Sequence, residues 1–292
     1  MKQQNEMNHT SLPPQLAEDI LEYGSDEKKK IHKEKTRNRN QPYAFLGGGN
    51  FGEEMCIEMF PESIGSASKG GMAFDNKTIN SNGELLSAKE VKFVSLVGTK
   101  ICNTCKQKAP PFQIACCYCG KTEFTHKSDS RAGLSSGAHI KFKKYINEYI
   151  IFVQNCNSNG TEITLSCYKF LSSNTYFDNY IQNQYDSGNS KGGSCNFLPF
   201  SYDWYMSGPI KIMDLTIDIS SDPVFTNIFY NPLETNICIN VADLKSVLTK
   251  DEKNILQIDN NTDKCIDYNL IVSKLTLRKK TIGKERGVVT RK

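Results

Sequence analysis

The sequence predicts a mixed α/β protein, of the α+β kind with a mixed sheet, that carries a metal-binding insert. Segments with the apolar pattern of strands are interleaved with segments that have helical spacing. Two Cys-x-x-Cys pairs lie close together in the first half of the chain. The 292 residues, of which 38% are hydrophobic, suffice for one large domain or two smaller ones with a buried core.

In the first half of the chain, the sequence predicts two helices followed by two strands. Apolar residues at helical spacing indicate a helix over 14–35, and a second helix is expected at about 52–60, where Pro61 ends it. Residues 72–79 and 84–96 read as strands joined by the turn sequence Asn-Ser-Asn-Gly. A helix and two strands are expected after the cysteine pairs, at 135–146, 148–154 and 161–170.

The second half is less regular. From 176 to 223 the chain is rich in Asn, Ser, Gly and aromatic residues, and within it 209–219 alternates like a strand. Residues 241–256 have helical spacing, and 267–279 read as a strand. These patterns predict a C-terminal mixed α/β region.

Charge is distributed unevenly although the formal net charge is only +4. The segments 27–40 and 274–292 are both strongly basic, as contact with a phosphate backbone requires. No apolar run has the length of a membrane helix, and the N-terminus has no signal-peptide core. We therefore expect a soluble cytoplasmic protein with no membrane partner.

Cysteine usage indicates a metal rather than crosslinks. The chain has eleven cysteines, an odd count, and five of them fall between 102 and 119. Two Cys-x-x-Cys pairs separated by ten residues are the ligand spacing of a structural zinc ribbon, at about 99–126. The predicted ligands are Cys102, Cys105, Cys116 and Cys119. Cys117 and His126 remain possible substitutes.

A charged strand follows the first turn. In the strand over 84–96, Glu90 and Lys92 point to one face while Val91 points to the other, into the core. A hairpin with the preceding strand would bring Asp75 beside Glu90. Carboxylate oxygens of Asp75 and Glu90, with the Val91 carbonyl, suit Mg²⁺. Such an ion polarises a phosphodiester and acidifies a bound water.

Two further groups complete this predicted site. Lys92 would position the water and stabilise negative charge in the transition state. Glu54 or Glu58, on the helix before the hairpin, would add a carboxylate from the side. The sequence therefore predicts four catalytic residues, listed as Asp75, Glu90, Lys92 and Glu54.

The order Asp75, fourteen residues, then Glu90-Val91-Lys92 resembles the PD-(D/E)xK nuclease superfamily. Ala73 and Phe74 stand where the motif has its proline, which is a departure. The resemblance covers about 45–170 and implies a restriction-endonuclease-like αβββαβ core. It implies a type II restriction endonuclease that cuts double-stranded DNA with Mg²⁺ as a homodimer. The products would carry 5′-phosphate and 3′-hydroxyl ends.

The predicted organisation has three parts. Residues 1–40 form an N-terminal helical and basic segment, and 41–175 form the nuclease core with its zinc-ribbon insert. Residues 176–292 form the C-terminal region, expected to recognise DNA and to end in a basic tail. Side chains expected to contact the DNA backbone follow the ribbon, and they are Arg131, His139, Lys141 and Lys143.

Two alternatives stay open. The chain has the features of a zinc-ribbon nucleic-acid-binding protein without catalysis, in which Glu90 and Lys92 would have no role. It also has paired Cys-x-x-Cys sequences like those around the active site of HNH-type nucleases. That class needs a catalytic histidine, and only His126 lies near the cysteines.

Overall fold

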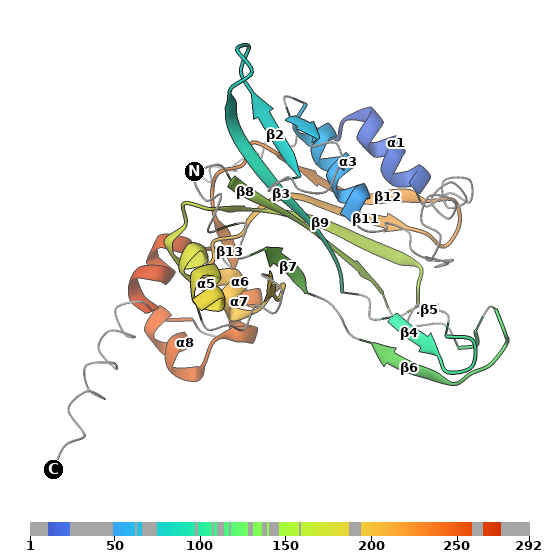
Figure 1. Ribbon diagram of the computed structural model, residues 1–292. Coiled ribbons are helices and arrows are strands. Elements are labelled where there is room, and N and C mark those ends of the chain that lie inside the picture. The colour runs from blue at the N-terminus through green and yellow to red at the C-terminus, as the bar shows by residue number, and fades with distance from the viewer. Residues whose placement is uncertain are drawn as a thin grey trace, which may run out of the picture.

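The structure, a computed structural model, is built around one curled mixed sheet with helices on both faces (Figure 1). A smaller three-stranded sheet extends away from the main sheet at the lower right of Figure 1. The structure describes residues 11–23, 49–61, 63–65, 75–96, 99–106, 108–109, 114–116, 118–127, 131–135, 139, 146–157, 159–186, 194–258 and 265–275.

The main sheet has seven strands in the order β1-β2-β3-β8-β9-β11-β12. Their bounds are Ser63–Gly65, Asn76–Ile79, Leu85–Ser95, Ile146–Cys156, Glu162–Leu171, Ile210–Asp218 and Val224–Tyr230. β3 and β8 pair in parallel, and every other neighbouring pair is antiparallel. Parallel neighbours need a long crossover, and the cysteine-rich insert lies within this one.

Alternation along β8 builds two cores. Ile150 and Phe152 pack on the face covered by α1 (Pro14–Tyr23) and α3 (Gly49–Met59). Ile151 belongs to the core on the other face. Because each strand residue points opposite to its neighbour, a strand buried on both faces reads as a continuous apolar run. The predicted mixed α/β class is confirmed.

The face that includes Ile151 is covered by elements from the C-terminal half (Figure 1). These are α5 (Thr175–Asp186), β10 (Ser194–Phe197), α6 (Tyr202–Met206), α7 (Val241–Val247) and α8 (Lys250–Leu256), with β7 (Ala132–Ser135) paired to β10. β11 and β12 come from the same half yet extend the main sheet. The sheet therefore continues across the boundary expected near residue 175.

The helix predicted over 241–256 is two helices. Leu248 has an extended backbone between them, and Thr249 caps α8 with a capping box that involves Glu252. Since Ser/Thr followed three residues later by Glu favours a new helix start, the break follows from the local sequence.

The strand predicted over 267–279 is wrong. Cys265–Asp267 form a strand, β14, and residues 268–275, the rest of the described part of this segment, are helical. Asp267 caps the helix by accepting from the backbone N–H groups of Asn269 and Leu270. The buried side chains recur at helical spacing, and they are Tyr268, Ile271 and Leu275. The apolar residues of this segment therefore form the buried face of a helix.

The cysteines include one crosslink, contrary to the expectation that none would form. A disulfide joins Cys238 in β13 (Cys238–Asn240) to Cys265 in β14, with the two Cα atoms 5.6 Å apart. Antiparallel pairing of these two strands brings the thiols together although 27 positions separate them in sequence. An odd cysteine count therefore did not exclude a disulfide.

Several predicted segments lie outside the described residues. These are the basic segment 27–40, most of the basic segment 274–292, the end of the helix predicted over 14–35, and most of the helix predicted over 135–146. Within the described ranges, no helix is long and apolar enough to span a bilayer.

Candidate active site and four-cysteine centre

The β2–β3 hairpin brings Asp75 beside the charged strand. Asn76 pairs with Lys89 in the antiparallel register, and Asp75, directly before β2, donates its backbone N–H to the Lys89 carbonyl 3.1 Å away. Its carboxylate oxygen Oδ2 accepts the backbone N–H of Val91 at 2.7 Å. The hairpin expected from the sequence thus brings Asp75 to Glu90-Val91-Lys92.

The ammonium of Lys92 lies among three oxygens. Its Nζ is 2.5 Å from Glu90 Oε1, 3.1 Å from the Val91 carbonyl oxygen and 3.6 Å from Asp75 Oδ2. These are the three groups that the sequence suggested as Mg²⁺ ligands. Glu90 and Lys92 meet because residues two apart on a strand share a face.

Charge and burial shift the pKa values of this cluster. Burial raises the pKa of Glu90, and repulsion from Asp75 adds to this, while Lys92 opposes it. Burial alone would lower the pKa of Lys92, but the carboxylates of Glu90 and Asp75 outweigh it and raise that pKa. Lys92 is therefore a cation at neutral pH.

α3 supplies a third carboxylate, from Glu53, which the sequence analysis did not single out. Burial and the charge of Asp75 raise the pKa of Glu53, while Lys92 lowers it. Its charge therefore interacts with Asp75 and Lys92 of the hairpin cluster. Glu54, the predicted residue, is exposed on the same helix. The rotation of the helix about its axis determines which of these two glutamates faces the hairpin. The short apolar pattern of this helix does not reveal that rotation.

His139 does not lie on the surface, which corrects its predicted contact with DNA. Its side chain is only 1% exposed. Its Nδ1 is 2.6 Å from the Tyr149 hydroxyl, and its Nε2 is 3.0 Å from Asp178 Oδ1 on α5. A phosphate cannot reach an imidazole enclosed in this way.

The other predicted DNA contacts have mixed outcomes. Arg131 is exposed, directly before β7. Lys141 and Lys143 lie outside the described residues. Among the predicted contacts that lie in the described residues, Arg131 is accessible and His139 is buried.

The His139 network adjoins the charged cluster. Tyr149 stands opposite Glu90 in the parallel register of β3 and β8. Burial raises the pKa of Tyr149, and the charge of Glu90 raises it further. Because buried polar groups need partners, the chain from Asp178 through His139 to Tyr149 ties α5 to the strand next to Glu90.

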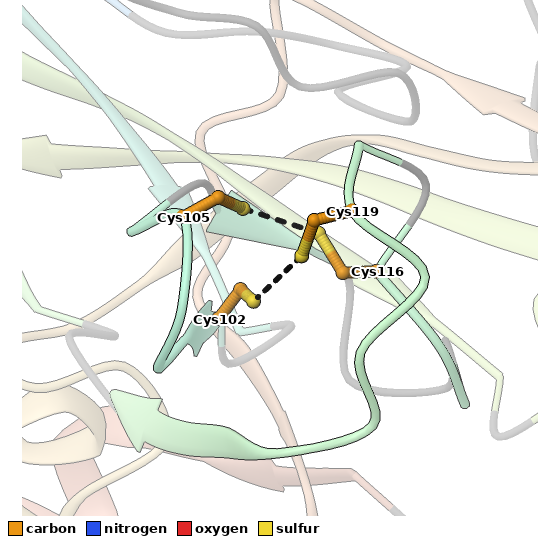
Figure 2. Close-up of side chains that lie close together, drawn as sticks. All are labelled: Cys102, Cys105, Cys116 and Cys119. Atoms are coloured by element: carbon orange, nitrogen blue, oxygen red, sulfur yellow. Dashed lines mark hydrogen bonds between the residues drawn. The ribbon is translucent and has the colours of Figure 1, made fainter.

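The four predicted zinc ligands converge in the small sheet. This sheet consists of β4 (Thr99–Cys102), β5 (Lys108–Ala109) and β6 (Phe124–Lys127), in the order β5-β4-β6. The four sulfurs lie within 4.8 Å of one another, with Cys102–Cys119 at 3.5 Å and Cys105–Cys116 at 3.4 Å. Figure 2 shows the four side chains pointing toward one another.

The two Cys-x-x-Cys turns share one construction. The carbonyl of Cys102 accepts the N–H of Lys106 at 3.0 Å, and the carbonyl of Cys116 accepts that of Gly120 at 2.7 Å. Lys106 and Gly120, each following the second cysteine of its pair, both have a left-handed backbone, with φ of 59° and 68°. Matching turns present two sulfurs each to a common centre.

This donor set fits zinc. Four thiolates form the closed tetrahedral shell of a structural zinc site. Hydrogen bonds from the backbone of Cys105 are the main cause that lowers the pKa of Cys102, to about 6, which favours the thiolate that binds metal. The two alternative ligands cannot be compared with these four, because Cys117 and the side chain of His126 lie outside the described residues.

Comparison with known proteins gives no relative: no family model, no curated protein and no solved structure matches this chain. Function must therefore be inferred from two local arrangements. One is the cluster of Asp75, Glu90 and Lys92, and the other is the four-cysteine centre.

Proposed function

We propose that the protein is a Mg²⁺-dependent, sequence-specific endonuclease for double-stranded DNA, of the type II restriction kind. The observation that carries the proposal is that Lys92 Nζ lies within 3.6 Å of Asp75 and 2.5 Å of Glu90. Residues fifteen positions apart in sequence thus form one cluster, which supports the resemblance to PD-(D/E)xK nucleases.

The oxygens fit Mg²⁺ because they are hard ligands that already surround a cation, the Lys92 ammonium. Asp75 and Glu90 would hold the ion, with the Val91 carbonyl as a third ligand and Glu53 close by. The chemistry that Mg²⁺ supplies in such a site is polarisation of the phosphodiester and acidification of a bound water.

The chain's own groups would orient the reaction. The Val91 N–H fixes Asp75 by its 2.7 Å hydrogen bond, so that carboxylate needs little reorganisation. Lys92 would donate to the attacking water and stabilise the charge that builds on the phosphate oxygens. Breakage of the P–O3′ bond would leave 5′-phosphate and 3′-hydroxyl ends.

The four-cysteine ribbon follows directly from the strand that bears Glu90, since β3 ends at Ser95 and β4 begins at Thr99. In this proposal zinc holds the ribbon, and the ribbon braces the end of β3 or contacts the duplex. A homodimer would cut both strands, since each site cuts one.

A second candidate is a zinc-ribbon nucleic-acid-binding protein without catalysis. The four-cysteine centre favours it, because this ribbon extends away from the main sheet (Figure 1). The two candidates differ in whether the Asp75–Glu90–Lys92 cluster is needed for any DNA-dependent reaction.

Cleavage of unmethylated phage DNA tests the proposal. The zinc-loaded protein with Mg²⁺ should give discrete fragments, and EDTA should abolish them. Glu90→Gln should still bind duplex DNA but not cut it. The matched control is Asp214→Asn, which also removes a carboxylate beside a lysine, since Lys211 Nζ is 3.0 Å from Asp214. Binding without cleavage by the wild type would favour the second candidate.

A further inference from the structure

We propose that Lys92 serves as a built-in cation that competes with the divalent ion for one position. In the metal-free protein its ammonium fills that position, and binding of the ion displaces it toward the scissile phosphate. The inference rests on the proposed function, because the competing ion is the one that cleavage needs.

The first argument is geometric. Glu90 Oε1, the Val91 carbonyl oxygen and Asp75 Oδ2 surround Nζ at 2.5, 3.1 and 3.6 Å. A bound Mg²⁺ takes oxygen ligands at about 2.0–2.1 Å. An ion held by these oxygens would occupy the volume that now contains the ammonium. The two cations therefore exclude each other.

The second argument is the charge balance. Glu53, Asp75 and Glu90 interact with one another and with Lys92. Asp75 and Glu53 both repel Glu90. One ammonium among three acidic side chains cannot balance their charge, so the cluster keeps a negative excess. A divalent ion would neutralise more of this charge than the ammonium does, so the cluster favours the exchange.

The third argument concerns how Lys92 leaves. Two carboxylates face the ammonium, from Glu90 at 2.5 Å and from Asp75 at 3.6 Å, and the divalent ion would take the same oxygens. The side chain must therefore move when the ion binds. It remains 24% exposed, so its long stem gives the ammonium a path to solvent. Once displaced, the ammonium lies at the edge of the site, where a phosphate would meet it.

Direct metal binding tests the inference without any cleavage. Mn²⁺ serves as the probe in titration calorimetry of the full, zinc-loaded chain, with no DNA. All measurements are made at pH 8, so that the wild type and the variants are compared under one condition. Lys92→Met keeps the apolar stem and removes the charge.

We expect Lys92→Met to bind Mn²⁺ about two- to fivefold tighter than the wild type, the size of one partly exposed ion pair. Lys211→Met, which removes the lysine 3.0 Å from Asp214, should leave the affinity unchanged. Lys92→Gln is the second variant if Lys92→Met does not fold, as judged by circular dichroism.

The outcomes separate the inference from the proposed function. If Lys92→Met binds Mn²⁺ no more tightly than the wild type while Asp75→Asn loses binding, the competition is overturned and the metal site stands. If neither wild type nor Lys92→Met binds Mn²⁺ saturably, the competition is overturned and the proposed metal-dependent function fails with it.

Discussion

The carboxylate of Asp75 accepts the backbone N–H of Val91 at 2.7 Å, across the β2–β3 hairpin. This bond fixes an acid from one strand beside Glu90 and Lys92 of the next. The same oxygen, Oδ2, lies 3.6 Å from the Lys92 ammonium, so one carboxylate joins the backbone of Val91 to the charge of Lys92.

Asp75→Asn should slow cleavage strongly while the fold persists. The amide oxygen still accepts the Val91 N–H, but the negative charge that holds Lys92 or a metal is lost. We expect cleavage to fall by about 10²-fold or more, as for the loss of one electrostatic group of an active site. Discrete-fragment assays measure the rate, and thermal unfolding should show a change of only a few degrees. Cleavage at the wild-type rate would contradict the role of Asp75.

Cys102→Ser should remove the zinc. Elemental analysis of the wild type should give about one zinc per chain, because four cysteines form one closed shell. The variant should contain much less. Cys156→Ser, at the end of β8 and not one of the four clustered cysteines, is the matched control and should keep its zinc. Equal zinc in both variants would rule out the four-cysteine site.

Substitutions in the two Cys-x-x-Cys turns should change zinc retention in opposite directions. Lys106→Gly relieves a left-handed lysine and should strengthen zinc retention, whereas Gly120→Ala introduces such strain. No atom lies within 4 Å of a Cβ added at Gly120, so its cost of about 1 kcal/mol would come from the backbone alone. Competition with a chromogenic zinc chelator measures both. Weaker retention in Lys106→Gly would contradict this account.

Tyr149→Phe should destabilise the fold by about 1–3 kcal/mol, because it leaves Nδ1 of the buried His139 without the hydroxyl 2.6 Å away. Urea unfolding gives the change in free energy. Tyr185→Phe, at an exposed tyrosine on α5, is the control and should have almost no effect. Equal stability of the two variants would show that the network contributes little.

Metal binding should weaken on acidification. Only an ionised Glu90 can hold Mn²⁺, and burial raises its pKa above the ordinary 4.5. As pH falls toward that raised pKa, protonation competes with the ion, and affinity should drop at a higher pH than an exposed carboxylate would give. Calorimetry between pH 5 and 8 follows the change. Below the pKa of Glu90, the affinity should fall about tenfold for each pH unit. An affinity that does not fall on acidification would contradict the role of Glu90 as a ligand of the ion.

The parts of the site that were predictable from the sequence depend on short-range rules. Strand alternation placed Glu90 and Lys92 on one face, and the turn at 80–83 predicted the hairpin that brings Asp75 near. Cysteine spacing predicted the four-sulfur cluster. Each rule needs only the residues within one hairpin or one turn.

The parts that were not predictable depend on packing between distant segments. Whether Glu53 or Glu54 faces the hairpin depends on how α3 lies on β3. The burial of His139 depends on Asp178, which is 39 positions away. The helix at 268–275 replaced a predicted strand because its apolar residues face a core that the local sequence does not reveal.

The small sheet lies inside the crossover that joins two parallel strands, from the end of β3 at Ser95 to the start of β8 at Ile146. Thr99 pairs with Lys127, so a ribbon folded on zinc brings the two ends of its own segment together. The chain that must still close between Ser95 and Ile146 is then roughly halved, and each halving lowers the entropic cost by about 0.6 kcal/mol. Zinc uptake before collapse would therefore speed the folding of the sheet that carries Glu90.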